Sequence, residues 1–192
     1  MKLARLASAA LFLAAPFVLA QSSPSPWKSD PAHSEVDFSI RHMMVSNVHG
    51  RFGAVDATLV WNAQDPTKST VNATIDVTGV DTGVPARDND LKSARFFDTA
   101  NNPKATFAST SVTKTASGLQ VAGNLTVKGV TKPVVLTVDT PTGPVSLRGK
   151  SHLGFSATTT LNREDFGVGA GMPTSMLGDD IKLTIELDFV QQ

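Results

Sequence analysis

The stretch IKLTIELDF, residues 181–189, alternates apolar and polar side chains at every position. Side chains of a β-strand point to the two faces of the sheet in turn, so this stretch has one apolar and one polar face. The apolar face consists of Ile181, Leu183, Ile185, Leu187 and Phe189. Such a strand is typical of an antiparallel sheet that covers a core on one side and meets water on the other.

Other stretches show the same alternation, and they lie at residues 36–40, 55–61, 71–77, 105–112, 119–127, 134–138 and 153–161. Gly, Pro, Asn and Asp gather between them, as turns require. Together with residues 181–189 they predict an all-β chain of about eight antiparallel strands. Eight strands can form a sandwich, or a barrel whose interior just accommodates side chains or one slender ligand. The alternation alone leaves both architectures open.

A short helix is the one helical element that the sequence predicts. It covers residues 85–95, begins with Pro85 in its first turn, and faces solvent except at Leu91 and Ala94. The helix lies in one of two long connections, residues 79–103 and 162–180. Connections of this length in a compact domain are usually lids, binding loops or disordered segments.

The first residues carry an export signal. Lys2 and Arg5 precede an apolar run at residues 9–19, and Ala20 follows as a small residue at the cleavage position. This layout predicts a secretory signal peptide over residues 1–20 and a periplasmic or secreted bacterial protein. Residues 21–26 predict a flexible leader, and residues 27–192 have the length of one domain.

Composition excludes several classes of site. The chain has no Cys, so it can form neither a disulfide nor a zinc–thiolate centre. Its formal net charge is zero, and acidic and basic residues are interspersed, so neither a nucleic-acid partner nor a polybasic membrane patch is expected. No nucleophile elbow, P-loop or dinucleotide fingerprint occurs. No cofactor and no metal are therefore expected.

The stretch SIRHMMVSNVHGRFG, residues 39–53, is the least regular part of the strand pattern. His42 shares strand parity with Ile40 and Met44, so the parity places its side chain on the apolar face. Buried polar groups need hydrogen-bond partners. Two interpretations follow: His42 bonds to its own barrel, or it meets the polar end of a ligand. The dipeptide at residues 49–50 is predicted to form the turn before a second strand, which Phe52 begins.

Two other functions remain open at this stage. A soft copper site could draw its ligands from His42, His49, Met43, Met44, Met172 and Met176, but the two adjacent methionines would point to opposite faces of a strand. An enzyme acting on a lipid or a small carbonyl compound would need a convergent histidine–acid pair.

Three arginines lie in or beside the long connections. Arg87, Arg95 and Arg163 each have an aspartate nearby in the sequence, namely Asp88, Asp98 and Asp165. Each arginine can therefore form a structural ion pair, or receive an anionic or carbonyl head group.

Four segments occur in an order and spacing that resemble the YceI family of exported bacterial proteins. They read DPAHSEVDFSIRHMMVSNVHGRF (residues 30–52), RDNDLKSARFFDTANNPKATF (87–107), LTVKGVTKPVVLTV (125–138) and FSATTTLNREDFGV (155–168). The resemblance covers the mature chain to about residue 189. It implies a lipocalin-like barrel of eight antiparallel strands with no shared catalytic reaction. In that family the apolar pore holds a polyisoprenoid, such as an isoprenoid quinone or a polyprenyl phosphate.

By this resemblance, residues 42–52 and 87–97 contribute to the pore and its mouth. The residues predicted to contact the lipid are Phe38, Ile40, His42, Met44, Phe52, Arg87, Leu91, Phe96, Phe97, Arg163 and Phe166. The lipid is the expected partner. Transient contact with a membrane or a membrane protein, and a homodimer, are further hypotheses.

Overall fold

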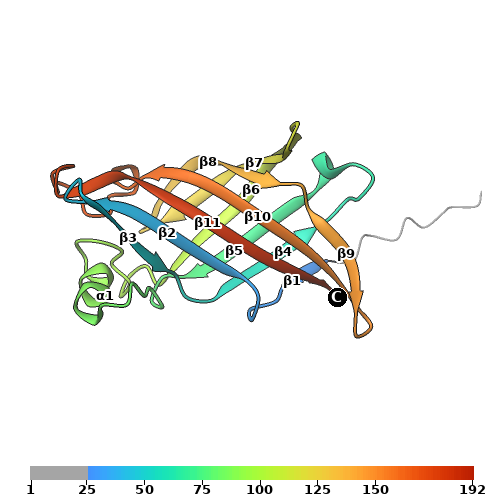
Figure 1. Ribbon diagram of the computed structural model, residues 1–192, viewed down its shortest axis with the longest axis horizontal. Coiled ribbons are helices and arrows are strands. Elements are labelled where there is room, and N and C mark those ends of the chain that lie inside the picture. Colours follow the sequence, from blue (N-terminus) through green and yellow to red (C-terminus); the bar gives the residue numbers. More distant parts are fainter. Residues whose placement is uncertain (1–25) are drawn as a thin grey trace, which may run out of the picture.

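The computed structural model describes residues 26–192, which form a β-barrel (Figure 1). The predicted signal peptide and residues 21–25 of the leader lie outside the described residues. The strands are β1 (Trp27–Ser29), β2 (Glu35–His42), β3 (Ser46–Arg51), β4 (Val55–Val60), β5 (Thr70–Asp76), β6 (Lys104–Lys114), β7 (Gly118–Val127), β8 (Val130–Asp139), β9 (Thr142–Leu147), β10 (Lys150–Asn162) and β11 (Leu177–Gln191). The helices are η1 (Pro66–Lys68), α1 (Pro85–Lys92) and η2 (Glu164–Phe166).

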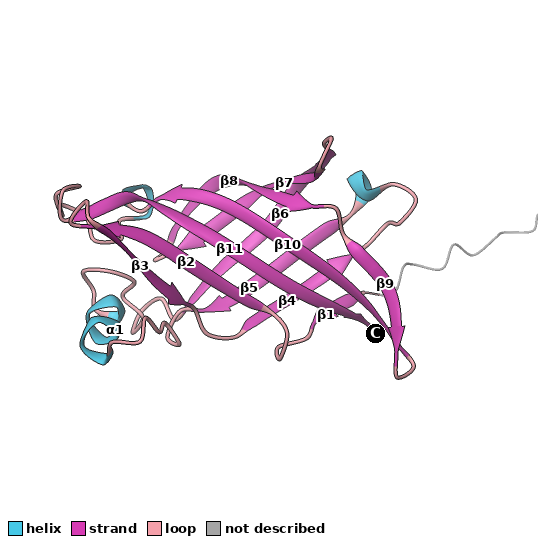
Figure 2. Cartoon of the chain, viewed as in Figure 1, coloured by secondary structure: helices cyan, strands magenta, loops and turns pink. Residues whose placement is uncertain are grey.

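The strands close into one antiparallel ring, because the long strands β10 and β11 pair along eleven register positions from His152↔Val190 to Asn162↔Asp180. The other edge of β11 pairs with β1 near its end and with β2 farther back. In the same way β8 and β9 share one edge of β10, and β3 and β4 pair with β2 and β1. The segments thus occupy eight positions around the barrel, and the predicted eight-stranded antiparallel barrel is confirmed (Figure 2).

The first hairpin differs from the prediction. Residues 49–50 lie inside β3, with Gly50 opposite Phe38. A Cβ at Gly50 would lie 2.4 Å from the Phe38 ring, so the glycine makes room for that ring rather than forming a turn. The turn occurs earlier: the Val45 N–H donates to the His42 carbonyl at 3.1 Å, and both intervening residues are left-handed.

The predicted inward direction of Met44 is therefore wrong. Strand β2 ends at His42, so strand parity no longer applies to Met43 and Met44, whose φ angles are 49° and 60°. Both side chains are more than half exposed, at 57% and 59%. They project from the tip of the hairpin instead of pointing to the two faces of a strand.

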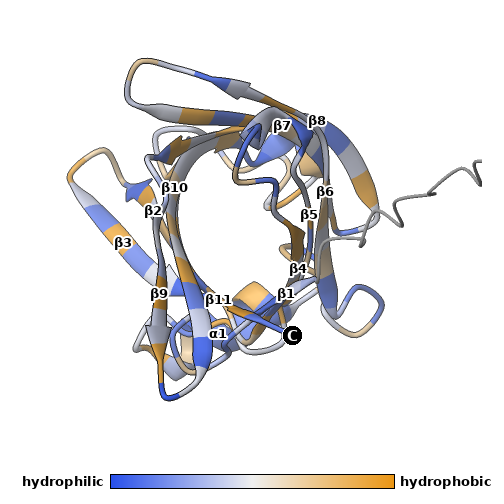
Figure 3. Cartoon of the chain, turned by 90° about the vertical axis from the view of Figure 1, so that its right-hand side faces the viewer, coloured by the Kyte–Doolittle hydropathy of each residue, from blue (hydrophilic) through white to orange (hydrophobic). Residues whose placement is uncertain are grey.

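The barrel has two unlike ends. The β2–β3 turn, α1 and the connection from β10 to β11 lie together at the left-hand end of Figure 1. The predicted helix thus exists but is shorter than expected, ending at Lys92. Figure 3 looks along the barrel from the other end and shows the strands as a closed ring. No helix among residues 26–192 is long and apolar enough to cross a membrane.

Candidate functional site: a tapered apolar cavity

The inward face of β11 is only half-buried, although it points into the barrel. Ile181, Leu183, Ile185 and Leu187 all keep partial exposure, whereas Phe189 at the end of the row is buried. An eight-stranded barrel is usually just wide enough for its side chains to fill it. Partial exposure of inward apolar side chains shows that this interior retains open space.

The open space forms three cavities in a row along β11. Ile181 lines the cavity at the α1 end, which we call the mouth cavity. Leu183 lines the next one, the middle cavity, and Ile185 and Leu187 line the deep cavity at the opposite end. The mouth cavity, about 200 Å³, is larger than the two inner cavities, about 70 Å³ each. The open space inside the barrel is therefore greatest at the mouth.

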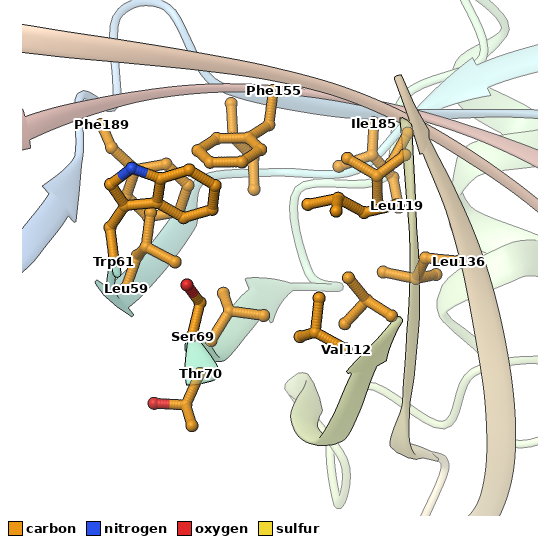
Figure 4. A pocket seen from close by; sticks show the side chains of 15 residues that line it. Leu59, Trp61, Ser69, Thr70, Val112, Leu119, Leu136, Phe155, Ile185 and Phe189 are labelled. Atoms are coloured by element: carbon orange, nitrogen blue, oxygen red, sulfur yellow. The ribbon is translucent and has the colours of Figure 1, made fainter. Parts of the chain in front are cut away.

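The deep cavity is bounded by an aromatic group at what we call the aromatic end (Figure 4). The rings of Trp61 and Phe155 meet edge to face at 5.5 Å, and those of Phe155 and Phe189 at 5.7 Å. The other lining side chains are apolar except Ser69 and Thr70. The Ser69 hydroxyl accepts a hydrogen bond from the Asn62 N–H at 3.0 Å. The deep cavity thus offers a ligand apolar contacts almost exclusively.

The aromatic ring of Phe107 lies at the level between the deep and middle cavities. Along the inward face of β7, Val121 lines the deep cavity and Leu125 the middle cavity, with Gly123 between them. A Cβ at Gly123 would lie 2.4 Å from the ring of Phe107, so the ring occupies the space of the missing side chain. The Phe107 ring therefore fills the barrel interior at the level between the two inner cavities, which share no lining residue.

The mouth cavity has an apolar lining with a few polar groups. Phe52, Phe97 and Ile181 line both it and the middle cavity, so the two spaces adjoin. Four charged or titratable side chains lie on its wall: His42, Arg87, Asp90 and Arg163. All three guanidinium nitrogens of Arg163 donate hydrogen bonds within the protein. Polar groups gathered at one end of an apolar channel are the arrangement that orients an amphipathic ligand.

His42 is the last residue of β2 and lies at the entrance of this cavity. Its backbone pairs with Ser46 and Leu177, so the hairpin and β11 fix its position. The residue is exposed, and its ring makes no hydrogen bond with any residue from 26 to 192. The interpretation that His42 bonds to its own barrel is therefore wrong. The ring is free to meet a ligand or water.

Arg87 is held by the loop that precedes α1. Its Nε donates to the Thr82 hydroxyl at 2.8 Å and its Nη2 to the Thr82 carbonyl at 2.9 Å. The Thr82 hydroxyl in turn donates to Asp88. The expected pairing with Asp88 therefore runs through Thr82, which orients the guanidinium on the cavity wall and leaves Nη1 without a partner among the described residues.

The guanidinium of Arg163 forms its hydrogen bonds with the connection between β10 and β11, although Arg163 also lines the cavity. It is 1% exposed, and its guanidinium donates to Asp179 and to five backbone carbonyls, those of Val168, Gly169, Met172, Leu177 and Gly178. The acidic partners are Asp179 at 2.8 Å and Glu164 at 3.4 Å, in place of the expected Asp165. Since every nitrogen already donates, Arg163 organises the connection between β10 and β11 and is not available to a head group.

Arg95 differs from both. Its guanidinium lies over the ring of Phe96 at 5.6 Å, a cation–π contact, and does not line the mouth cavity. The carboxylate of Asp98, its expected partner, accepts hydrogen bonds from Asn101 and Asn102 instead.

A family model described as a YceI-like domain matches residues 27–189, nearly all of the described chain. The chain belongs to the YceI family. Protein YceI of Salmonella newport (strain SL254) is 37% identical to it over 161 residues, which are 83% of either chain. Protein YceI of Escherichia coli O17:K52:H18 gives the same identity and coverage.

Solved structures agree with this YceI-family assignment. The YCEI protein of Campylobacter jejuni is 30% identical and superposes with a TM-score of 0.71, covering 79% of this chain and 90% of that one. BcnA of Burkholderia cenocepacia, at 24% identity, reaches a TM-score of 0.76 over 83% and 98% of the two chains. A polyisoprenoid binding domain from Saccharophagus degradans, implicated in plant cell wall breakdown, is 17% identical with a TM-score of 0.63, covering 86% and 98%. The last two show the fold alone.

In this YceI-family barrel, ten of the eleven predicted contact residues line the mouth or the middle cavity. They are Phe38, Ile40, His42, Phe52, Arg87, Leu91, Phe96, Phe97, Arg163 and Phe166; Met44 does not. That any of them contacts a ligand stays a prediction. Sequence reasoning missed Asp90, Met172 and Met176 on the mouth wall. The two methionines lie in a connection without periodicity, so no pattern could place them.

The histidines do not gather as the copper hypothesis requires. His42 shares the mouth cavity with Met172 and Met176, but His49 lines a separate outer groove with Arg51 and Asp81. Met43 and Met44 lie on the exposed turn. Nor does His42 form a hydrogen bond with an acid among residues 26–192, as the enzyme hypothesis would need.

The other two histidines lie on the outer face of the barrel. His33 Nδ1 lies 2.9 Å from Asp30, and His152 Nδ1 lies 3.0 Å from Asp188. The hydrogen bond between His33 and Asp30 raises the pKa of His33 above 6.5 and lowers the pKa of Asp30 below 3.8. The first pair lies within the β1–β2 turn, and the second joins β10 to β11. None of the four residues lines one of the three cavities.

Proposed function

We propose that the protein binds one polyisoprenoid lipid inside its barrel and is a carrier rather than an enzyme. The observation that supports this best is the row of cavities along β11, which is almost entirely apolar inside and has its unengaged charged or titratable groups at the mouth. A prenyl chain gains about 0.8 kcal/mol for each CH₂-sized group that it buries. The small inner cavities suit such a chain, and the larger mouth cavity suits its head group.

The polar groups of the mouth favour one of the two head groups expected from the family. Arg87 and His42 can both donate to a carbonyl oxygen. Asp90 lies on the same wall and would repel a phosphate dianion. An isoprenoid quinone is therefore the better fit, and a polyprenyl phosphate the poorer one. The polyisoprenoid binding domain from Saccharophagus degradans shares the fold and supports the lipid class.

We also propose that the protein works outside the cytoplasm, in the periplasm or as a secreted protein. The pattern of residues 1–20 supports this, and a carrier is needed where a water-insoluble lipid must cross an aqueous compartment. Fractionation of the native host with N-terminal sequencing tests it: the mature chain is expected outside the cytoplasm and to begin at Gln21. A full-length cytoplasmic chain would contradict it.

A titration with two neighbouring tryptophan variants tests the lipid site. Leu183→Trp fills the middle cavity, whereas Lys182→Trp adds the same ring on the outer face of the same strand. With a detergent-dispersed isoprenoid quinone, Leu183→Trp is expected to weaken binding at least about tenfold, since the chain loses several buried groups. Lys182→Trp should bind like the parent, and both variants should keep the parent's circular dichroism. Equal binding by both variants would place the lipid elsewhere.

A further inference from the structure

Exposed apolar side chains lie together on one side of the barrel mouth. We call the group of Met43, Met44, Val45 and Met176 the methionine rim. Met43, Met44 and Met176 are 57%, 59% and 52% exposed, and Val45 is 77% exposed. The Met43 N–H donates to the Met176 carbonyl at 2.9 Å, so the hairpin tip and the β10–β11 connection present these residues side by side. Met176 also lines the mouth cavity, so the rim is continuous with the proposed lipid entrance.

The backbone of the hairpin tip makes the choice of residues unusual. A tight turn with two left-handed residues strongly favours Asn-Gly or similar pairs, because other side chains are strained there. This turn contains Met43 and Met44 at φ 49° and 60°. Local strain of this kind persists where the surrounding structure and the function require it. The turn keeps two long apolar side chains in water at a position where glycine or asparagine would be more stable.

A basic side chain lies next to the methionine rim, as expected of a surface that inserts into the interface of a lipid bilayer. Arg41 donates to the Met44 carbonyl at 3.0 Å and to the Asn47 side chain, which places a cation directly behind the apolar tip. Apolar side chains with a basic group just behind them are the arrangement of interfacial membrane anchors. Methionine is flexible and packs well against irregular surfaces, such as acyl chains.

We propose that the methionine rim docks on a lipid bilayer surface, so that a lipid passes between the membrane and the mouth cavity without crossing water. This rests on the proposed function for its purpose, but the docking itself can be measured without any ligand. The driving force is apolar burial of the rim. Binding should therefore occur on zwitterionic vesicles and depend little on salt.

The test compares two variants that remove similar apolar groups from opposite ends of the barrel. Met43→Asn with Met44→Gly removes the rim methionines and gives the turn the residues it favours. Val145→Thr with Leu147→Thr removes two side chains of β9, 49% and 56% exposed, at the aromatic end. Both variants are first compared with the parent in thermal unfolding, and the Asn-Gly variant is expected to be at least as stable.

Flotation with phosphatidylcholine vesicles free of isoprenoid measures docking. The parent and the β9 variant should float with the vesicles, and the rim variant should lose binding about tenfold or more. Failure of the parent to float, or equal flotation of the parent and the rim variant, would overturn the proposal. An equal loss in both variants would also overturn it, because it would indicate general stickiness rather than a docking surface.

Titration with detergent-dispersed isoprenoid quinone separates this proposal from the proposed function. All three proteins should bind it alike, since neither pair lines the inner cavities. If the parent binds no quinone, the proposed function fails while the flotation result still decides docking. Should the rim variant unfold, Met44→Trp replaces it: brominated phosphatidylcholine should quench the new tryptophan but leave one introduced by Val145→Trp unquenched. Equal quenching of the two would overturn the proposal.

Discussion

The two ends of the barrel use their side chains in opposite ways. At the aromatic end, Phe155 contacts both Trp61 and Phe189 edge to face, and Phe189 is 2% exposed. At the mouth, the ring of His42 has no hydrogen-bond partner among residues 26–192, and methionines are exposed to water. At the aromatic end the rings pack against one another, whereas at the mouth the His42 ring and the methionine side chains remain available to a partner. Substitutions of side chains that are packed or fully hydrogen-bonded should therefore change stability most, and substitutions of the unengaged groups at the mouth should change binding.

The largest effect on stability is expected from Phe189→Ala. Phe189 is 2% exposed, packs against Phe155 and the cluster around Trp27, and bounds the deep cavity, so truncation enlarges that cavity. The free energy of unfolding should fall by about 3–5 kcal/mol in urea denaturation. Val190→Ala, the next residue and on the outer face, is the control and should cost less than about 1 kcal/mol. A similar cost for both would show that the aromatic end is not tightly packed.

The next largest effect is expected from Arg163→Met. The substitution removes the donors that hold five backbone carbonyls and Asp179 around the β10–β11 connection. Leaving such groups without partners should cost about 3–5 kcal/mol. Hydrogen exchange should rise over residues 163–178 in particular. Arg95→Met, which removes only a cation–π contact, should cost less than about 1 kcal/mol. Unchanged exchange in that connection would contradict the structural role given to Arg163.

Strand β11, Arg163 and strand β9 show which features of the fold could be predicted from the sequence and which could not. Strand β11 alternates strictly, because one face meets the cavity and the other meets water, and this pattern made the barrel predictable. The role of Arg163 depends on carbonyls brought together by left-handed glycines, such as Gly167 and Gly169, and carbonyls leave no trace in residue identity. Strand β9 was missed for another reason: all of its residues are exposed, so it has no apolar face.

The hairpin at the mouth was mispredicted because its turn lacks the usual signal. Met43 and Met44 occupy left-handed positions that normally contain glycine or asparagine, while Gly50 lies in a strand to accommodate the Phe38 ring. The prediction from the sequence therefore placed the turn at Gly50, and it placed the Met44 side chain inside the barrel. Among the mouth residues, Phe38, Ile40 and His42 followed from the parity of β2, whereas Val48 on the unpredicted strand β3 and Met172 on a connection did not.

His42→Leu should affect binding alone. The ring makes no hydrogen bond with any described residue, so the free energy of unfolding should change by less than about 0.5 kcal/mol. Affinity for an isoprenoid quinone should fall about two- to tenfold, the contribution of one hydrogen bond. Affinity for squalene, which lacks a polar head, should stay constant, and His49→Leu on the outer groove should change neither. An equal loss for squalene would show that His42 acts through packing.

The smallest effect concerns pH and lies outside the cavities. The pKa of His33 is raised above 6.5 by its bond to Asp30, so its stabilising contribution is present below pH 6.5 and is lost as pH rises through the raised value. The pKa of Asp30 is lowered below 3.8, so its contribution is present above pH 3.8 and is lost as pH falls through the lowered value. The melting temperature of His33→Gln should differ from the parent's most between these limits. A constant difference at all pH values would exclude this linkage.

The most direct test of the central claim, that the barrel holds a prenyl lipid, is mass spectrometry of what the protein carries. The protein is purified from its native host without detergent, extracted with organic solvent, and compared with Leu183→Trp, whose middle cavity is filled. The parent is expected to yield an isoprenoid lipid in near-equimolar amount, and the variant much less. Repeated extracts of the parent without any isoprenoid, or with equal amounts from both proteins, would contradict the claim.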